Sequence, residues 1–460
     1  MKTEYKSLSY WHDSLPDPLQ ARAALQQDLD VDLAIVGAGY TGLWTAYYLK
    51  QIDPALNIAI LESEVAGFGA SGRNGGWCSG FLSGIDMWLE NPAQREGALR
   101  LQKLMYETVR EVGEVAQKQS IDCHFEQSGA LEIAVLPAHM QRLRQEVDHQ
   151  HGLGFSDSDY RWLSATEIRD ALNVDKAAGG LMMSHCAAIH PARLARGLAE
   201  TVVQLGVALY EKSPVLEIKG RELRTLHGRI RAGTTILATE GFSHNLPGQQ
   251  RRLIPVHSMM VATEPLDQRQ LEDINFSKRY TFANGDRVVT YGQVTDDMRI
   301  AFGCRGTYHL GSAIQSLFDS GDPEFELIRT TLLRFFPALK GIRFTHAWGG
   351  AMGVSRSLRP SVNFDPESGL GWAGGYFGNG VGASHLAGKT MADLVMSRDS
   401  ERVHTPWVNP SDLRKKWEPE PLRWLGIKSA RVMMHLADQL EYRGGSLALK
   451  SAAALDKLIP

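Results

Sequence analysis

The chain has 460 residues, of which 43% are hydrophobic and 22% are charged, and its formal net charge is -3. This length exceeds what one hydrophobic core usually supports, so we expect a globular protein of two closely joined domains. The small net charge gives no field that would attract nucleic acid or an anionic membrane, so we expect neither as a partner.

The four cysteines lie far apart and include no CxxC pair; they are Cys78, Cys123, Cys186 and Cys304. This spacing predicts neither a disulfide framework nor a metal site, and it is typical of a reducing compartment. The first residues, MKTEYKSLSYWHDSLPDP, contain no apolar signal segment, and no apolar run is long enough to span a bilayer. The sequence therefore favours a cytoplasmic protein.

The N-terminal part of the chain predicts a βαβ unit. Residues 1–30 are mostly polar, and we expect them to form an arm. A strand is expected over 33–36, a helix through 43–49 and a second strand over 58–61, with a glycine-rich turn before the helix. This order implies a parallel sheet, and thus an α/β fold.

Further helices and strands follow, separated by glycine clusters at 67–84 and 374–388. Helices are expected at about 95–119, 190–206, 323–336 and 386–396, and strands at 129–136, 208–218, 229–238 and within 255–345. A ligand that binds all the glycine clusters requires a domain assembled from separate pieces of chain. We expect this domain to comprise 1–90, 187–255 and 341–400, a substrate domain 91–186 and 256–340, and a helical extension 401–460.

The turn before the first helix matches the dinucleotide fingerprint G-x-G-x-x-G. It consists of Gly37, Ala38, Gly39, Tyr40, Thr41 and Gly42. In such a turn the first glycine permits the tight bend, the second lets the backbone approach a pyrophosphate, and the third lets helix and strand pack closely. Glu62 lies 20 residues beyond Gly42 at the end of the second strand, where a carboxylate accepts hydrogen bonds from ribose hydroxyls.

A second glycine-rich loop directly follows this acidic residue. Its candidate ligand-binding residues are Ser71, Gly72, Arg73, Asn74, Gly75 and Gly76. Backbone N–H groups in such a run line phosphates or a flavin edge, and the hydroxyl and guanidinium groups add donors. The alternative is a flexible surface loop.

These motifs resemble those of the amine- and amino-acid-oxidising flavoproteins of the D-amino acid oxidase superfamily, and most of all its γ-glutamylputrescine oxidase-like branch. The resemblance rests on VGAGYTGLWTAYYL (36–49), GFGASGRNGG (67–76), ILATEG (236–241) and AGGYFGNGVGASHLAG (373–388). It implies a Rossmann-type FAD-binding domain and a substrate domain with a mixed or antiparallel sheet and helices.

The resemblance also implies roles for residues outside the fingerprint. Val215 would contact the adenine, and Thr239 and Gly241 would close the pocket near the pyrophosphate. The residues facing the flavin's pyrimidine edge would be Gly378, Asn379, Gly380, Val381 and Gly382. A helix N-terminus at that edge would stabilise the negative charge of reduced flavin. Neither Cys78 nor Cys304 matches the family's pattern for a covalent link, so we expect non-covalent FAD.

The implied reaction is hydride transfer from a C–H bond beside a neutral amine to flavin N5. The resulting imine hydrolyses to an aldehyde or keto product plus an amine, and O2 reoxidises the flavin. Two alternatives remain open: a dehydrogenase that passes electrons to a quinone or carrier, and a flavin-binding partner protein without turnover. The flavin performs the redox chemistry, so no catalytic triad is expected, and none is visible.

Met352 bears on the substrate. In glycine oxidase-like relatives an arginine that binds the α-carboxylate stands where WGGAMG (348–353) places Met352. This favours an amine whose anionic group is distant or absent over a simple α-amino acid. If the alignment is shifted by a few residues, Arg356 or Arg359 would occupy the position of that arginine.

The other candidates for the substrate pocket are Trp77, Phe81, His257, Tyr291 and Arg305. The alternative for Trp77 and Phe81 is that they are ordinary core aromatics. The alternative for His257 is a hydrogen-bonded core histidine, and the alternative for Arg305 is an ion pair at the domain interface. Near the C-terminus, residues 417–443 predict a helix that lies on a membrane surface or packs on protein. The sequence does not determine the oligomeric state.

Overall fold

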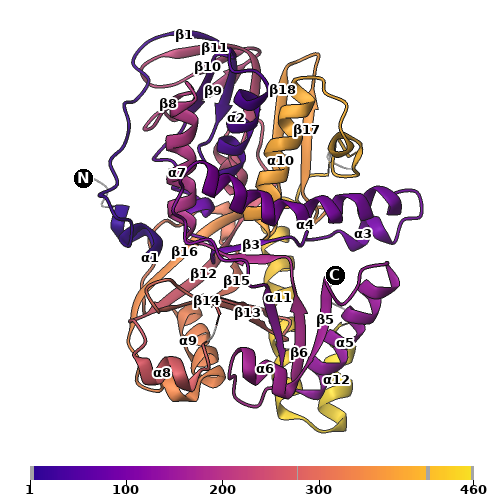
Figure 1. Cartoon of the computed structure of the whole chain (residues 1–460). Coiled ribbons are helices and arrows are strands. Elements are labelled where there is room, and N and C mark those ends of the chain that lie inside the picture. Colours follow the sequence, from indigo (N-terminus) through magenta and orange to yellow (C-terminus); the bar gives the residue numbers. More distant parts are fainter. Residues whose placement is uncertain (1–4, 277, 411–414, 457–460) are drawn as a thin grey trace.

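The structure is a computed structural model that describes residues 5–276, 278–410 and 415–456. It consists of two halves, each built on a large sheet (Figure 1). In the first sheet, β1 (Leu29–Val36) pairs in parallel with β2 (Ile58–Leu61) and with β11 (Arg229–Leu237). The helix α2 (Tyr40–Ile52) connects β1 to β2, so the predicted βαβ unit is present.

The rest of the first sheet extends on both sides of this unit. Its other strands are β8 (Ala208–Tyr210), β9 (Glu217–Lys219), β10 (Glu222–Arg224), β17 (Ser361–Asp365) and β18 (Leu370–Gly374). Along β1, Leu33 and Ile35 face one hydrophobic core, whereas Ala34 and Val36 face another on the opposite side of the sheet. The helices that pack in the first of these cores are α2, α4 (Arg95–Lys118), α7 (Pro191–Gln204) and α10 (Gly380–Val395).

The second sheet is antiparallel except where β4 and β13 pair. Its strands, in spatial order, are β16 (Phe344–Ser355), β12 (Leu253–Thr263), β15 (Ile300–Thr307), β14 (Thr290–Val294), β13 (Thr281–Asn284), β4 (Ala130–Ala134), β6 (Gly179–Met183) and β5 (Tyr160–Ser164). One face packs against α9 (Pro323–Phe335) through aromatic residues that include Phe282, Phe302 and Phe325. The resemblance's two-domain α/β architecture, with its mixed second sheet, is thus confirmed.

Smaller elements join the two halves or cover them. The short strands β3 (Trp77–Ser79) and β7 (Cys186–Ala188) form a two-stranded sheet. The remaining helices are α1 (Tyr10–Asp13), α3 (Asp86–Leu89), α5 (Pro137–Gly152), α6 (Ala165–Ala171), α8 (Gln268–Asp273), α11 (Leu422–Arg443) and α12 (Ser446–Asp456). The 3-10 helices are η1 (Tyr5–Leu8), η2 (Ala70–Gly72), η3 (Glu240–Asn245), η4 (Leu310–Ser312), η5 (Pro337–Leu339) and η6 (Glu401–His404).

Two segments, α4 and β16, each belong to the half of the molecule other than the one in which they were expected. α4 packs its apolar face, which includes Leu101 and Met105, in the core of the first half, because that face fits against α10. β16 belongs to the second sheet, where it pairs along its whole length with β12. The glycines at 349, 350 and 353 weaken the strand pattern of this segment, which is why the sequence reads as a glycine-rich region.

The prediction of a polar N-terminal arm is wrong for residues 5–12, whereas residues 14–28 are irregular and mostly exposed, as predicted. Tyr10 and Trp11 are buried where the two halves meet, in a cluster with Trp348. The indole nitrogen of Trp11 donates a hydrogen bond to the carbonyl oxygen of Asn74 at 2.8 Å. Residues 5–12 therefore support the second glycine-rich loop instead of extending into solvent.

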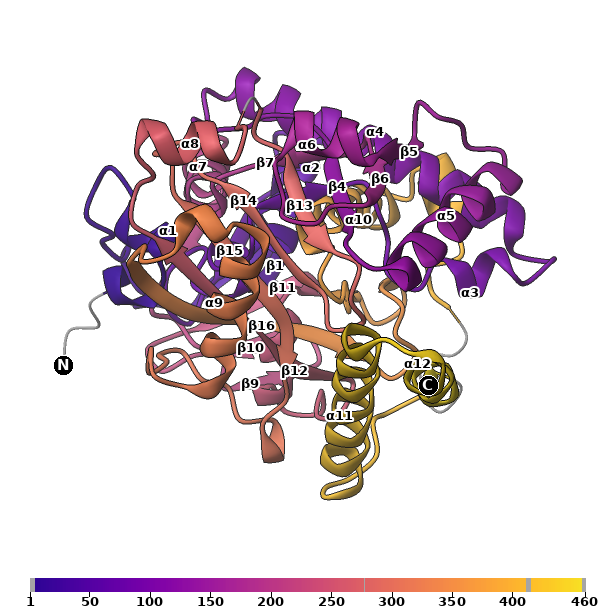
Figure 2. The same cartoon turned by 90° about the horizontal axis from the view of Figure 1, so that it is seen from below.

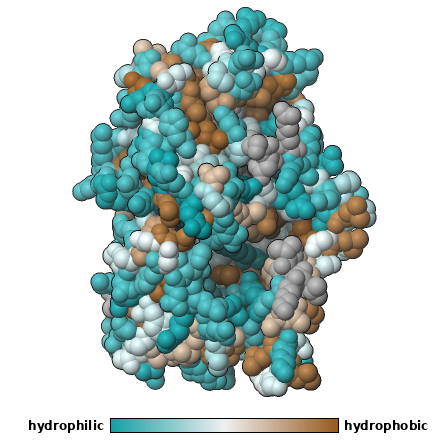
Figure 3. All heavy atoms as spheres, turned by 90° about the vertical axis from the view of Figure 1, so that its right-hand side faces the viewer, coloured by the Kyte–Doolittle hydropathy of each residue, from teal (hydrophilic) through white to brown (hydrophobic). Residues whose placement is uncertain are grey.

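The predicted C-terminal helix is α11, and it packs on the second half of the molecule. Arg287 pairs with Asp438 at 3.1 Å and with Glu441 at 2.7 Å. α11 and α12 lie side by side in Figure 2. The face in Figure 3 is largely hydrophilic, with apolar groups scattered over it. Within the residues that the structure describes, no helix is long and apolar enough to cross a membrane.

Candidate functional site: a chamber between the two sheets

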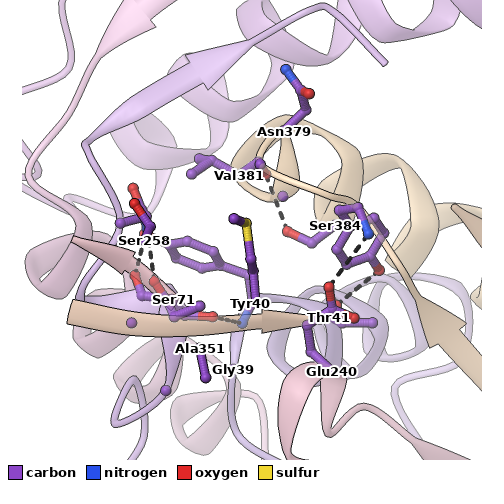
Figure 4. A pocket seen from close by; sticks show the side chains of 18 of the residues that line it. Gly39, Tyr40, Thr41, Ser71, Glu240, Ser258, Ala351, Asn379, Val381 and Ser384 are labelled. Carbon is purple, nitrogen blue, oxygen red and sulfur yellow. Dashed lines mark hydrogen bonds between the residues drawn. The ribbon is translucent and has the colours of Figure 1, made fainter. Parts of the chain in front are cut away.

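A chamber of about 740 Å3 lies between the two halves of the molecule. One part of its wall comes from the ends of β1 and β2 and the first turns of α2 and α10; the other comes from β4, β12, β14, β15 and β16. Figure 4 shows the region where these two parts of the wall meet. The size is typical of cofactor and ligand clefts.

The turn after β1 has a geometry that requires glycine. Gly37 has a φ of +106°, and a Cβ on Gly42 would lie 2.1 Å from the carbonyl oxygen of Gly37. The N-cap of α2, Gly39, makes no side-chain capping bond, so N–H groups of the first turn remain for a ligand. This is the arrangement that binds phosphate at a helix N-terminus.

The carboxylate of Glu62 holds this turn and faces the chamber. It accepts hydrogen bonds from the backbone N–H of Ala38 at 2.8 Å and of Glu64 at 2.9 Å. Burial raises the pKa of Glu62 above its usual value. The side chain thus fixes the backbone of the glycine turn in addition to lining the ligand space.

The second glycine-rich loop contains the 3-10 helix η2 and is tied to α2. Ser71 Oγ accepts a hydrogen bond from the backbone N–H of Tyr40 at 2.9 Å. Arg73 is fully buried, and its Nη1 donates to the carbonyl oxygens of Ser316 and Gly349 at 3.3 Å. Its Nη2 has no partner within the described residues, and burial lowers the pKa of Arg73 to about 10. A buried, chamber-lining cation with an unpaired donor fits an anionic ligand.

The N-terminus of α10 forms a second group of free amides on the chamber. Its N-cap, Asn379, makes no capping bond and instead donates from Nδ2 to Ser79 Oγ at 3.1 Å. A Cβ on Gly382 would lie 2.4 Å from the carbonyl oxygen of Ser79. α10 packs directly on α2, where a Cβ on Gly388 would lie 2.6 Å from Cβ of Trp44. This contact brings the N-termini of α2 and α10 to the wall of the same chamber.

Most of the predicted cofactor residues line the chamber. They are Gly37, Gly39, Tyr40, Thr41, Glu62, Ser71, Arg73, Asn74, Gly75, Val215, Thr239, Gly378, Asn379, Gly380 and Val381. The others lie behind its wall, namely Ala38, Gly42, Gly72, Gly76, Gly241 and Gly382. The glycines of this second group permit close contacts: Cβ atoms on Gly72 and Gly76 would lie 2.2 Å from Gly67 O and 1.9 Å from Gln293 Nε2.

Five of the six substrate-pocket candidates also line the chamber, namely Trp77, Phe81, Tyr291, Arg305 and Met352. The hydroxyl of Tyr291 shares a short hydrogen bond with Ser258, which lines the chamber beside it. The Trp77 indole donates to the carbonyl oxygen of Gly292 at 3.2 Å. These contacts fix the two aromatic rings against the second sheet.

His257 does not line the chamber. Its neighbour Ser258 does, so His257 points to the opposite face of β12, because successive strand residues alternate between faces. There Nε2 of the fully buried His257 accepts a hydrogen bond from Gln315 N at 3.1 Å, and burial lowers its pKa to about 4. This is the core histidine that the sequence left as the alternative.

Neither alternative arginine replaces Met352 in the chamber wall. Arg356 lies beyond the end of β16 and pairs with Glu418 at 2.9 Å. Arg359 stacks over the Trp88 ring, 5.1 Å from its centroid. Met352 itself pairs with Val256 across the sheet, which fixes its register.

Sequence reasoning missed two chamber-lining carboxylic acids, Asp86 and Glu132, and gave no separate role to a third, Glu240, within the segment 239–241. Glu240 accepts backbone hydrogen bonds from Gly375 at 2.9 Å and Gly353 at 3.2 Å, and burial raises its pKa to about 7. The available signal was its place directly after the buried strand β11. Glu132 gave a different signal, a lone acid between Leu131 and Ile133 in an apolar strand.

Residues 32–394 match the family model described as DAO, FAD dependent oxidoreductase. The chain belongs to this family. The predicted FAD cofactor and the predicted class, an FAD-dependent oxidoreductase of amines or amino acids, are thereby confirmed.

Relatives share most of the chain's length. A probable oxidoreductase, OrdL, of Haemophilus influenzae is 28% identical over 86% of this chain and 89% of its own. Gamma-glutamylputrescine oxidoreductase of Escherichia coli is 28% identical over 82% of this chain and 86% of its own. Among solved structures, glycine oxidase from Bacillus cereus matches with a TM-score of 0.65 at 20% identity, covering 81% of this chain and 97% of that one.

The residues on the chamber fit FAD. Two helix N-termini with free amides, the unpaired Nη2 of the buried Arg73 and the carboxylate of Glu62 supply donors and an acceptor of the kinds that a dinucleotide requires. Cys78 and Cys304 do not line the chamber; both are buried in hydrophobic cores.

Proposed function

We propose that the protein oxidises a C–N bond of a small amine or N-substituted amino compound with non-covalently bound FAD, and that O2 is the electron acceptor. The observation that carries this proposal is the continuity of the chamber. Its wall runs from the glycine turn of α2 to the side chains of Tyr291, Met352 and Arg305 without a separating layer of protein.

In this proposal each part of the wall has its own task. The turn at 37–42 and Arg73 would hold the pyrophosphate, Glu62 the ribose, and Val215 the adenine. The first turn of α10 would hold the flavin ring, where its amides stabilise added negative charge. Bound FAD supplies the redox chemistry, and the chain's own side chains position the amine and exclude water.

Met352 supports an amine substrate over a simple α-amino acid. Its thioether is apolar and cannot bind a carboxylate next to the reacting carbon. The similarity to gamma-glutamylputrescine oxidoreductase supports a substrate of that kind, an amine whose charged group lies far from the oxidised bond. The four free cysteines support a place in the cytoplasm.

The test uses purified protein. We expect a yellow protein whose flavin is released by acid precipitation and whose absorbance bleaches anaerobically with γ-glutamylputrescine or a related amine. The screen should include N-methylated amines, aminophosphonates and D-amino acids. A protein that neither contains nor takes up FAD, or whose flavin no amine reduces, would contradict the proposal.

A dehydrogenase is the second candidate, and exposed apolar residues on α11 favour it. Leu422, Leu425, Val432 and Leu436 are between 45% and 63% exposed, as expected if an acceptor protein or membrane surface approaches there. Hydrogen peroxide formed in proportion to amine consumed, with no gain from an added quinone, would exclude this candidate.

A further inference from the structure

The end of the chamber formed by the second sheet contains a cation without a carboxylate partner. Arg305 extends from β15, and its side chain is exposed to the chamber. Within the described residues its guanidinium makes no hydrogen bond or ion pair. It lies 5.6 Å from the centroid of the Phe377 ring, and a Cβ on Gly378 would lie 3.4 Å from its Nε. An arginine that lines a ligand space and has all its donors free is suited to bind a carboxylate.

A carboxylic acid without a hydrogen-bond partner among the described residues lines the same chamber. Glu132 is on β4, where Leu131 and Ile133 face the hydrophobic core and the acid therefore faces the chamber. In the described part of the chain nothing donates a hydrogen bond to its carboxyl group. Burial and, to a smaller extent, the charge of Glu146 raise the pKa of Glu132, the charges of Arg305 and Arg142 lower it, and the net pKa is about 7.

The remainder of this end is mostly apolar. Phe81 and Val289 line it, together with Ala283 and Met183 of the second sheet. Asp86 also lines the chamber, and its Oδ1 lies 3.9 Å from Nε2 of His149. Apolar side chains together with a cation and an acid that have no hydrogen-bond partner among the described residues match a chain-like ligand whose far end carries both charges.

We propose that Arg305 binds a carboxylate and Glu132 binds an ammonium group at the remote end of the substrate, so that these two residues determine specificity. This inference rests on the proposed function. Each residue loses its contact with water on ligand binding, and the two ligand charges replace that solvation.

The test compares two substrates that differ in the remote charges. γ-Glutamylputrescine carries a carboxylate and an ammonium group at the end away from the reacting amine, whereas putrescine lacks the carboxylate. In the holoenzyme, Arg305→Met should lower kcat/KM for γ-glutamylputrescine about 10- to 100-fold more than for putrescine, as expected for one lost charge-assisted hydrogen bond. Arg356→Met, which removes an arginine outside the chamber, is the matched control and should change neither substrate's kcat/KM.

A binding measurement keeps this inference separate from turnover. γ-Glutamylbutylamide has the same charged end but lacks the amine to be oxidised, and its binding is followed by the absorbance change of oxidised flavin. We expect Arg305→Met and Glu132→Gln each to weaken binding about 10- to 100-fold with FAD content unchanged. If the wild-type enzyme does not bind this ligand, or if both variants bind it as tightly as wild type, the inference is overturned. Failure of every amine to reduce the flavin contradicts the proposed function instead.

Discussion

The two ends of the chamber are built by different means. The end near α2 and α10 presents backbone amides. Its segments lie so close together that a Cβ added to several of its glycines would be only 2–3 Å from neighbouring atoms. The wall formed by β4 and β15 presents single side chains, such as Glu132 and Arg305, from strands that are far apart in the sequence, and Arg305 reaches across to Gly378 just before α10. The first end should therefore be sensitive to added atoms, and the second to changes of charge.

The largest effect is expected at the crowded end. Gly42→Ala puts a methyl group 2.1 Å from the carbonyl oxygen of Gly37, so the turn and α2 must separate. We expect a loss of about 1–3 kcal/mol in the free energy of unfolding, and loss of most bound FAD. Urea unfolding and the ratio of flavin to protein absorbance measure both.

Gly426→Ala is the matched control. Gly426 lies inside α11, and nothing is within 4 Å of the position of its Cβ. Because alanine is the better helix former, this change should stabilise the protein by about 0.5–1 kcal/mol and leave FAD content unchanged. Equal FAD content in the Gly42→Ala variant would show that the tight turn is not needed for cofactor binding.

The next effect concerns charge beside the flavin end. Met352→Arg places a guanidinium where the chamber wall is apolar, and it should bind the carboxylate of a simple α-amino acid. We expect the ratio of kcat/KM for glycine to that for γ-glutamylputrescine to rise about 10- to 100-fold. Met352→Leu, which keeps the position apolar, should leave this ratio unchanged. A Met352→Arg variant with the wild-type ratio would place the reacting carbon elsewhere.

A pH dependence is expected at the far end. The pKa of Glu132 is about 7, and Glu146, Arg142 and Arg305 are the charged groups that act on it. Because an ammonium ligand requires the ionised acid, γ-glutamylbutylamide should bind weakly below pH 7 and up to about tenfold more tightly by pH 8. Glu132→Gln should abolish this gain. A variant that retains the wild-type pH profile would assign the titration to another group.

The smallest effect is expected from a single hydroxyl. Tyr291→Phe removes the hydrogen bond to Ser258 and keeps the ring in the chamber wall. We expect a loss of about 1 kcal/mol in the free energy of unfolding and a change of a few-fold in kcat/KM. A thousandfold loss of kcat/KM would instead make this hydroxyl part of the chemistry.

The same difference between the two ends explains what the sequence predicts. The glycine turn, the strand before it and Glu62 are neighbours in the chain, so one local pattern specifies them together. Arg305 and Glu132 line one chamber only because β14 and β13 join β15 and β4, which are distant in the sequence, into one sheet. The sequence does not show which face of a strand a residue occupies, so it did not distinguish His257 from its neighbour. Ser258 lines the chamber and His257 does not.

The sequence also did not predict two buried elements, β16 and α1, because their local sequence patterns are weak. β16 contains three glycines, and only its pairing with β12 makes it a strand. α1 is four residues long, and its position depends on Trp348 and Asn74, which are distant in the sequence. In both cases contacts across the fold determine the local structure.

The most direct test of the central claim is the crystal structure of the purified protein, grown with γ-glutamylbutylamide. The account predicts density for FAD along the first turns of α2 and α10, and density for the ligand between Tyr291 and Arg305 with its carboxylate on the guanidinium. A chamber that holds no flavin, or a ligand bound with its charged end away from Arg305 and Glu132, would contradict it.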